Sequence, residues 1–365
     1  MHRDDIVITP EYVLGRYFIR YDKLNELFHY AYNGMEVNRV NLFIDLYSVY
    51  HAVFSRSYRT TVKEYVALTS QIINLCIHYR TYFRHLGIYC KIFIISSYNI
   101  PQDSLQLIPE YNSIMVDKLK NKIIEEMVDL NTGLLEILCP YLPDIHFIKT
   151  DYESSVVMNH IINIENSIPS EDKAPIQSII LTSDLYPIQL AAQLPNVSYL
   201  HPIKTFKKDD SFIVPQNTLS DAKFQFWRAI LRKFQNSFSY DRVGSISPSN
   251  FVLLAALNRF PDRCLNLLYN VSVSSKLISQ VIGFDSIKIT PQSLFDMVPR
   301  EQFGEIDLDY IDRRYKVLDF TYQSILYNQS IESKTLHYEN LEDSNAINLI
   351  NDKYFKNNPI DIFRL

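Results

Sequence analysis

Glycine is scarce in this chain, and its scarcity excludes two common kinds of nucleotide site. The sequence holds only 7 glycines among 365 residues, and it contains neither a G-x-G-x-x-G fingerprint nor a P-loop. Both motifs need glycine because the bare backbone must approach a phosphate closely. A G-x-S-x-G nucleophile turn is also missing. The chain is therefore not expected to cradle nucleotide phosphates or to be a serine hydrolase of that type.

Long apolar runs and paired cysteines are missing too. No window approaches the roughly 20 apolar residues that a membrane-spanning helix requires, so we expect no membrane association. The N-terminal stretch MHRDDIVITPEYV carries early acids and no apolar signal core, so we expect no secretion. The four cysteines lack zinc-ligand spacing and predict buried thiols in a reducing compartment. We expect a cytoplasmic protein (host cytoplasm for a phage) or a virion component.

The chain also lacks an excess of positive charge. The formal net charge is −5, whereas proteins that bind nucleic acid chiefly through its phosphates usually carry a basic excess. Any nucleic-acid binding is therefore expected to be weak and to use local basic groups. What the chain has instead is tyrosine, 26 in all, together with many isoleucines and asparagines. This bias is typical of an AT-rich genome and indicates a phage or another virus.

Two stretches share a plan of apolar strand, carboxylate and helix. Residues 40–44 form an apolar run that ends in Asp45, and apolar residues then recur at helical spacing. Residues 179–181 lead in the same way to Asp184. Open α/β proteins bind ligands at the carboxyl ends of their strands, so two acids delivered there indicate a metal site. The alternative is that Asp45 only caps the helix that comes after it.

Strands alternate with helices along the first 200 residues, which predicts a mostly parallel sheet flanked by helices, followed by a mainly helical C-terminal region. The predicted strands are 40–44, 91–95, 145–148, 179–181 and 197–200. The main predicted helices are 62–86 (ended by Gly87), 115–139, 153–164 and 315–327. The predicted units are an N-terminal extension (1–39), an α/β domain (40–215), a helical domain (216–300) and a C-terminal region with a terminal tail (301–365).

Four local motifs succeed one another within residues 40–200. They are FIDLYSVY around Asp45; IFIISS, with LIPEYNS shortly after it; DYESSVVMNHI around Glu153; and TSDLYPIQL around Asp184. In their order and separation they resemble the PIN-like 5′-nuclease superfamily, which includes flap endonucleases and phage and bacterial 5′–3′ exonucleases. The resemblance implies a PIN-like α/β fold.

The motifs depart from the family pattern at several acidic positions. Ser96 and Ser97 stand where the second motif has its acid, Ser155 and Val156 where the third has two, and Tyr186 where the fourth has its second. The family hydrolyses phosphodiesters with two divalent cations about 4 Å apart. Such hard cations need a cluster of carboxylates.

The resemblance leaves three candidate catalytic and metal-binding residues, Asp45, Glu153 and Asp184, which suffice for one weak Mg²⁺ or Mn²⁺ site. We therefore expect a 5′-nuclease-like protein that has lost hydrolysis and acts as a nucleic-acid-associated or assembly module. The alternative is an active Mg²⁺- or Mn²⁺-dependent 5′-nuclease with an atypical ligand set that recruits Asp103, Glu110 or Asp151.

Two pairs of basic residues are candidate nucleic-acid contacts. Lys118 and Lys122 lie four residues apart and share a helix face, although such a face is most often simply solvated. Arg228 and Arg232 accompany Phe226 and Trp227, a mixture suited to single-stranded nucleic acid. The alternative for this second pair is an amphipathic helix with an aromatic core face and a basic wet face.

The tail contains a short apolar anchor, Ile360, Asp361, Ile362 and Phe363. It resembles the terminal peptide by which replication proteins hold a sliding clamp, but it lacks the leading glutamine. The alternative is that the tail docks on its own domain. The expected protein partners belong to a replication, transcription or virion assembly.

Overall fold

The computed structural model describes less than half of the chain. The described residues are 37–46, 49–50, 64–97, 102–109, 122–167, 176–182, 187, 190, 194, 196–200, 253, 289–299, 301, 308–331, 348 and 355. The predicted N-terminal extension and nearly all of the predicted helical domain lie outside these ranges. The predicted domain boundaries therefore stay predictions.

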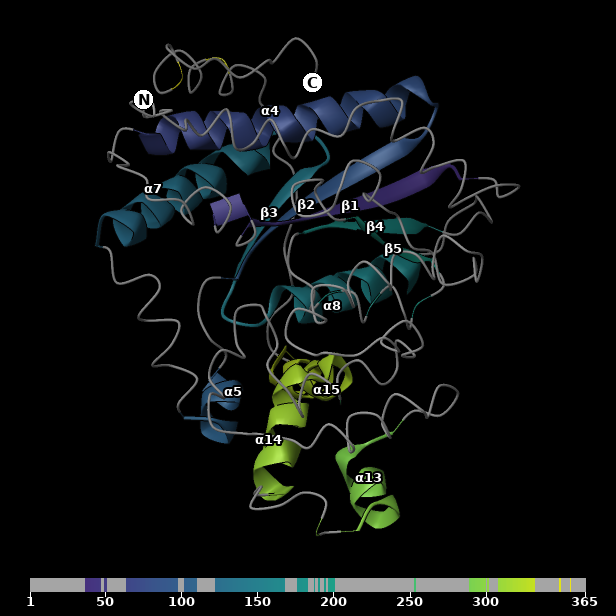
Figure 1. Ribbon diagram of the computed structural model, residues 1–365. Coiled ribbons are helices and arrows are strands. Elements are labelled where there is room, and N and C mark those ends of the chain that lie inside the picture. The colour runs from purple at the N-terminus through teal and green to yellow at the C-terminus, as the bar shows by residue number, and fades with distance from the viewer. Residues whose placement is uncertain are drawn as a thin grey trace, which may run out of the picture.

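Five parallel strands form one sheet in the order β3-β2-β1-β4-β5 (Figure 1). The sequence predicts all five, and each begins and ends within two residues of its expected limits. The strands are β1 (Arg39–Asp45), β2 (Tyr89–Ser97), β3 (Ile145–Thr150), β4 (Gln177–Leu181) and β5 (Val197–Leu200). The alternation of strands and helices makes the parallel pairing predictable, and the α/β fold class is confirmed.

Helices α4 (Glu64–His85) and α7 (Lys122–Leu138) cover one face of the sheet (Figure 1). Successive side chains of a strand point to opposite faces. Val40, Leu42 and Ile44 of β1 belong to the core cluster that α4 and α7 complete. The predicted glycine cap is confirmed, because Gly87 has a φ of 73° just after α4, a region that favours glycine.

Helix α8 (Ser154–Ser167) covers the opposite face (Figure 1). On this face Phe43 stacks on Phe93 at 5.1 Å between ring centroids, and Phe93 contacts the His146 ring at 5.3 Å. The sheet is thus the middle of three layers. The odd-numbered residues of β1, Asp45 among them, face the α8 layer.

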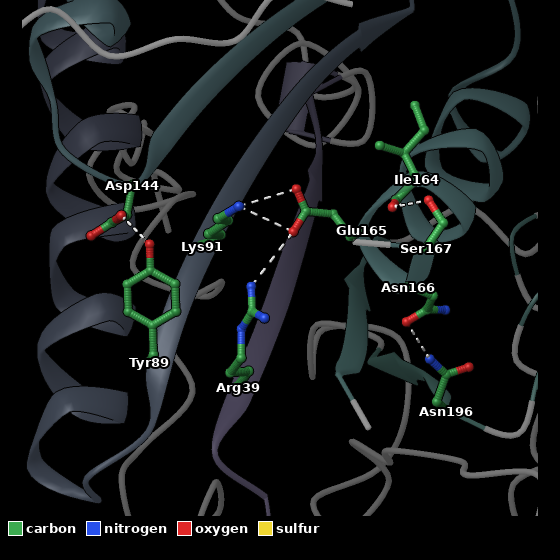
Figure 2. A network of polar contacts seen from close by, with 9 residues as sticks. All are labelled: Arg39, Tyr89, Lys91, Asp144, Ile164, Glu165, Asn166, Ser167 and Asn196. Atoms are coloured by element: carbon green, nitrogen blue, oxygen red, sulfur yellow. Dashed lines mark hydrogen bonds and ion pairs between the residues drawn. The ribbon is translucent and has the colours of Figure 1, made fainter. Parts of the chain in front are cut away.

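The C-terminal end of α8 is tied to the sheet by an ion cluster around the buried Glu165 (Figure 2). Glu165, only 1% exposed, accepts hydrogen bonds at 3.1 Å from the Lys91 ammonium and lies 4.0 Å from the Arg39 guanidinium. Arg39 begins β1, so this cluster lies at the amino ends of the strands. Helix α8 therefore runs from the carboxyl edge of the sheet to its amino edge.

Beyond α8 lie helices from distant parts of the sequence (Figure 1). These are α5 (Gln102–Leu107), α13 (Pro291–Met297), α14 (Leu308–Leu318) and α15 (Phe320–Ile331). The prediction of one helix over 315–327 is wrong, because the chain breaks at Asp319. There the Asp319 carboxylate accepts a hydrogen bond from the Thr321 amide at 3.1 Å and so begins a new helix. Among the described helices, none has the length and apolarity to cross a membrane.

Candidate functional site at the carboxyl edge of the sheet

Asp45 ends β1 with its side chain fully buried. The Thr182 hydroxyl donates a hydrogen bond to Asp45 Oδ2 at 3.0 Å. This contact results from the register, because Ile44 pairs with Leu181 and so sets Thr182 beside Asp45. A buried carboxylate needs such donors, since burying a charge without them is costly. The structure thus joins the carboxyl ends of β1 and β4 through a polar contact.

Glu153 lies on the short segment between β3 and α8. Its backbone carbonyl accepts a hydrogen bond from the Val156 amide at 3.0 Å, so Glu153 stands at the N-cap of α8. Its side chain is half-buried. The segment is held by its neighbour Tyr152, whose carbonyl accepts from the Ser97 hydroxyl at 2.6 Å and whose amide donates to the Thr150 hydroxyl at 3.1 Å.

Strand β2 lies between the strands that deliver Asp45 and Glu153. Neighbouring strands are about 4.8 Å apart, so the ends of β1 and β3 are separated by about 10 Å. Strand β2 ends between them in Ser96 and Ser97, which are 2% and 4% exposed. Asp45 pairs with Ile95, so of the two serines Ser97 is on the face of Asp45, two residues further along, and its hydroxyl holds the Tyr152 carbonyl.

Ser155 stands at the same edge, on the first turn of α8. It is 0% exposed. Its buried hydroxyl forms no hydrogen bond within the described structure.

The described residues do not fit a centre of two divalent cations. Within the described ranges, no three side chains of His, Cys, Asp or Glu gather as a metal-binding group. Asp45 and Glu153 are the retained acids that the structure describes, and Asp184 lies outside it. A single hard cation at this edge would take oxygen ligands from these acids and from water.

The other predicted site residues are mostly outside the described part of the chain. Lys122 begins α7 and Asp103 lies on α5, but the placement of their side chains is not described. Asp151 is exposed on the segment that carries Glu153. The remaining predicted residues, all outside the described ranges, are Lys118, Glu110, Arg228, Arg232, Ile360, Asp361, Ile362 and Phe363.

Sequence reasoning misses two hydroxyls that support the acids. It identifies Thr182 only as the start of the fourth motif, and Ser97 only as the loss of an acid. The sequence does carry a signal for Thr182. This residue directly follows one buried strand, so in a parallel sheet it lies beside Asp45, which ends the neighbouring strand. No local signal marks the bond from Ser97 to the Tyr152 carbonyl, which joins positions 55 residues apart.

No protein-family model and no curated protein matches this sequence. Among solved structures, one similar to the chain is a bacteriophage T5 flap endonuclease complex with DNA and metal ions, with a TM-score of 0.46 and 10% identity over 87% of this chain and 97% of that one. A T5 5′-exonuclease with bound zinc has a TM-score of 0.44 and 11% identity over 80% and 89%. The catalytic core of Rad2 with DNA substrate has a TM-score of 0.42 and 12% identity over 91% and 94%. At these identities the similarity concerns the fold alone.

Proposed function

We propose that this chain, whose fold is that of the PIN-like 5′-nucleases, associates with nucleic acid and has lost phosphodiester hydrolysis. The observation that carries the proposal is the end of β2, the strand between those of Asp45 and Glu153, which finishes in Ser96 and Ser97 and not in an acid. A serine hydroxyl is neutral and cannot replace the charge of a carboxylate beside a divalent cation.

Electrostatics makes this loss decisive for a reaction that uses two cations. Two unit charges 4 Å apart interact by about 1 kcal/mol in water, so two divalent cations repel by about 4 kcal/mol, and more in a less polar site. Surrounding carboxylates must offset that repulsion. With Asp45, Glu153 and Asp184 as ligands, the edge suits one Mg²⁺ or Mn²⁺ bound weakly.

Nucleic acid would be held by local basic groups, because the net charge of −5 opposes general attraction to phosphates. Lys118, Lys122, Arg228 and Arg232 are the proposed contacts. Fluorescence anisotropy with a labelled 5′-flap duplex tests this. The double variant Lys118→Ala with Lys122→Ala is expected to bind several-fold more weakly and with a shallower salt dependence.

The matched control for that measurement is the double variant Arg84→Ala with Lys316→Ala, which also removes two positive charges. Arg84 is exposed in the last turn of α4, and Lys316 pairs with Asp312 at 2.7 Å on α14. Equal weakening in both variants would mean that total charge, and not this helix face, governs binding. Absence of any binding by the unaltered chain would refute the nucleic-acid association itself.

The proposed setting is a replication, transcription or virion assembly of a phage. Within it the tail residues 360–363 are proposed to insert into a partner such as a sliding clamp, in the manner of a short apolar anchor. Deleting the last eight residues should abolish binding to the cognate clamp. Unchanged clamp binding would contradict this role and favour the alternative that the tail docks on its own domain.

An active enzyme with an atypical ligand set is the second candidate. The exposed Asp151 favours it, because it lies two residues from Glu153 at the same edge. A Mn²⁺ titration monitored by thermal unfolding separates the candidates, since a ligand at 100 times its Kd stabilises the folded state by about 2.7 kcal/mol. Two saturable sites lost in Asp151→Asn would support the active enzyme.

A further inference from the structure

Helix α15 contacts the segment that carries Glu153, although the two are far apart in sequence. The Tyr327 ring, 2% exposed, meets the Tyr152 ring edge to face at 4.7 Å between centroids. It meets the His160 ring of α8 at 5.3 Å with planes 85° apart. Beside these rings the Asn159 amide donates to the Ser324 hydroxyl at 3.3 Å. One buried tyrosine therefore touches both the segment and the helix that flank Glu153.

The same pair of C-terminal helices also holds the segment that leaves β2. Ile108, just after α5, packs against Val317 of α14. The Ser104 hydroxyl of α5 donates to the Gln323 side chain of α15 at 3.5 Å. Helices α14 and α15 thus contact the segments that leave β2 and β3, the two strands that end beside the candidate site (Figure 1).

The segment 151–153 depends on such contacts for its conformation. It is three residues long and belongs to no helix or strand. Fixing the backbone of one residue costs about 1–2 kcal/mol, which local contacts must offset. Ser97 and Thr150 hold the Tyr152 backbone, and Tyr327 holds its ring. These three contacts, two from the sheet and one from α15, help to fix the peptide that leads into Glu153.

We propose that Tyr327 is a positioning residue for Glu153. Through the Tyr152 ring it keeps the 151–153 segment in the conformation that presents the Glu153 carboxylate at the carboxyl edge of the sheet. The C-terminal helices thereby become part of the site rather than a separate addition. The inference deepens the proposed function and rests on it in one respect, that Glu153 is a ligand of the single cation.

The test compares Tyr327→Ala, Tyr327→Phe and the control Gln323→Ala in the full chain. Gln323 anchors the same helix, but its hydrogen bonds join α15 to α5 and to the Lys316 carbonyl rather than to the Glu153 segment. The first readout is amide hydrogen exchange at residues 152–157 without metal. We expect faster exchange there in Tyr327→Ala, wild-type exchange in Tyr327→Phe, which keeps the ring contacts, and wild-type exchange at these amides in Gln323→Ala.

The second readout is Mn²⁺ affinity, measured by electron paramagnetic resonance of the free ion. Groups that orient metal ligands typically contribute about 10- to 100-fold to affinity, so we expect at least about a 10-fold weaker Kd in Tyr327→Ala and little change in the other two variants. If Tyr327→Ala and Gln323→Ala have equal effects on both readouts, Tyr327 contributes only to general packing and the inference is overturned.

The two readouts separate failure of this inference from failure of the proposed function. If the unaltered chain binds no Mn²⁺, the single-cation site is wrong, while the exchange data still decide whether Tyr327 orders the segment. If Mn²⁺ binds and Tyr327→Ala changes neither its affinity nor the exchange of residues 152–157, the cation site stands and the positioning role is refuted.

Discussion

At the scale of single residues, two hydroxyls make polar contacts at the carboxyl edge. Thr182 donates to Asp45 and Ser97 donates to the Tyr152 carbonyl, whereas the buried Ser155 hydroxyl forms no hydrogen bond within the described structure. The motif resemblance predicts acids at the positions of these two serines. A serine hydroxyl is neutral, so neither residue adds negative charge to this edge.

The Thr182 contact makes a specific stability prediction. Thr182→Val keeps the shape of the side chain but removes the donor to the Asp45 carboxylate, and hydrogen bonds to charged groups contribute about 1.5–3 kcal/mol. We expect a loss of that size in the free energy of unfolding, measured by urea denaturation. The control Thr132→Val removes a hydroxyl bonded to the Val128 carbonyl within α7 and should lose less. A loss no larger than that of the control would contradict the assigned role.

His146 makes the fold sensitive to acid. Burial, together with the nearby Lys91 charge, lowers the pKa of His146 to about 4. The unfolded chain then binds more protons between pH 4 and 6.5, so stability is complete above the unfolded pKa and falls as the pH drops toward 4. The expected loss from this group is about 2–3 kcal/mol.

His146→Phe tests this, because phenylalanine keeps the ring contact with Phe93 and does not titrate. Urea denaturation across this pH range should show a weaker pH dependence for the variant than for the unaltered chain. Parallel curves for the two proteins would show that His146 does not carry the acid sensitivity.

At the scale of elements, α8 links the candidate site to the opposite edge of the sheet. Its N-terminus presents Glu153 at the carboxyl edge, and its C-terminus is tied by Glu165 at the amino edge (Figure 2). Lys91→Met would remove the closer cation from buried Glu165 and leave Arg39 at 4.0 Å. Breaking a fully buried pair costs about 3–5 kcal/mol, and because Lys91 is partly exposed we expect about 2 kcal/mol.

The control for Lys91→Met is Lys316→Met, whose partner Asp312 lies on the exposed face of α14. Exposed pairs four apart on a helix contribute about 0.3–0.5 kcal/mol, so this variant should lose little. Chemical denaturation of both variants gives the comparison. Equal losses would show that the Glu165 cluster is no stronger than a surface pair.

The elements are predictable to the extent that their pattern is local. Each strand is a short apolar run, and the carboxylate after Ile44 marks the end of β1. The break between α14 and α15 escapes prediction because the residues around Asp319 keep helical apolar spacing, and the break depends on a side-chain bond to the Thr321 amide. The spacing of apolar residues alone does not predict such a cap.

At the scale of the whole molecule, the site combines a predictable part and an unpredictable one. Chain order and the parallel sheet bring Asp45 and the Glu153 segment to one edge, which the motifs anticipate. The contact of Tyr327 with Tyr152 joins positions 175 residues apart, and no local pattern encodes it. The placement of Asp184 lies outside the described residues, so its part in the site stays a prediction.

The most direct test of the proposed loss of hydrolysis is a cleavage assay on a 5′-flap duplex with Mg²⁺ or Mn²⁺. With Ser96 and Ser97 between the strands of the two acids, the chain should release no product above the level of its own Asp45→Ala variant, even where anisotropy shows the duplex to be bound. Cleavage that requires the divalent cation and disappears in Asp45→Ala would contradict the account.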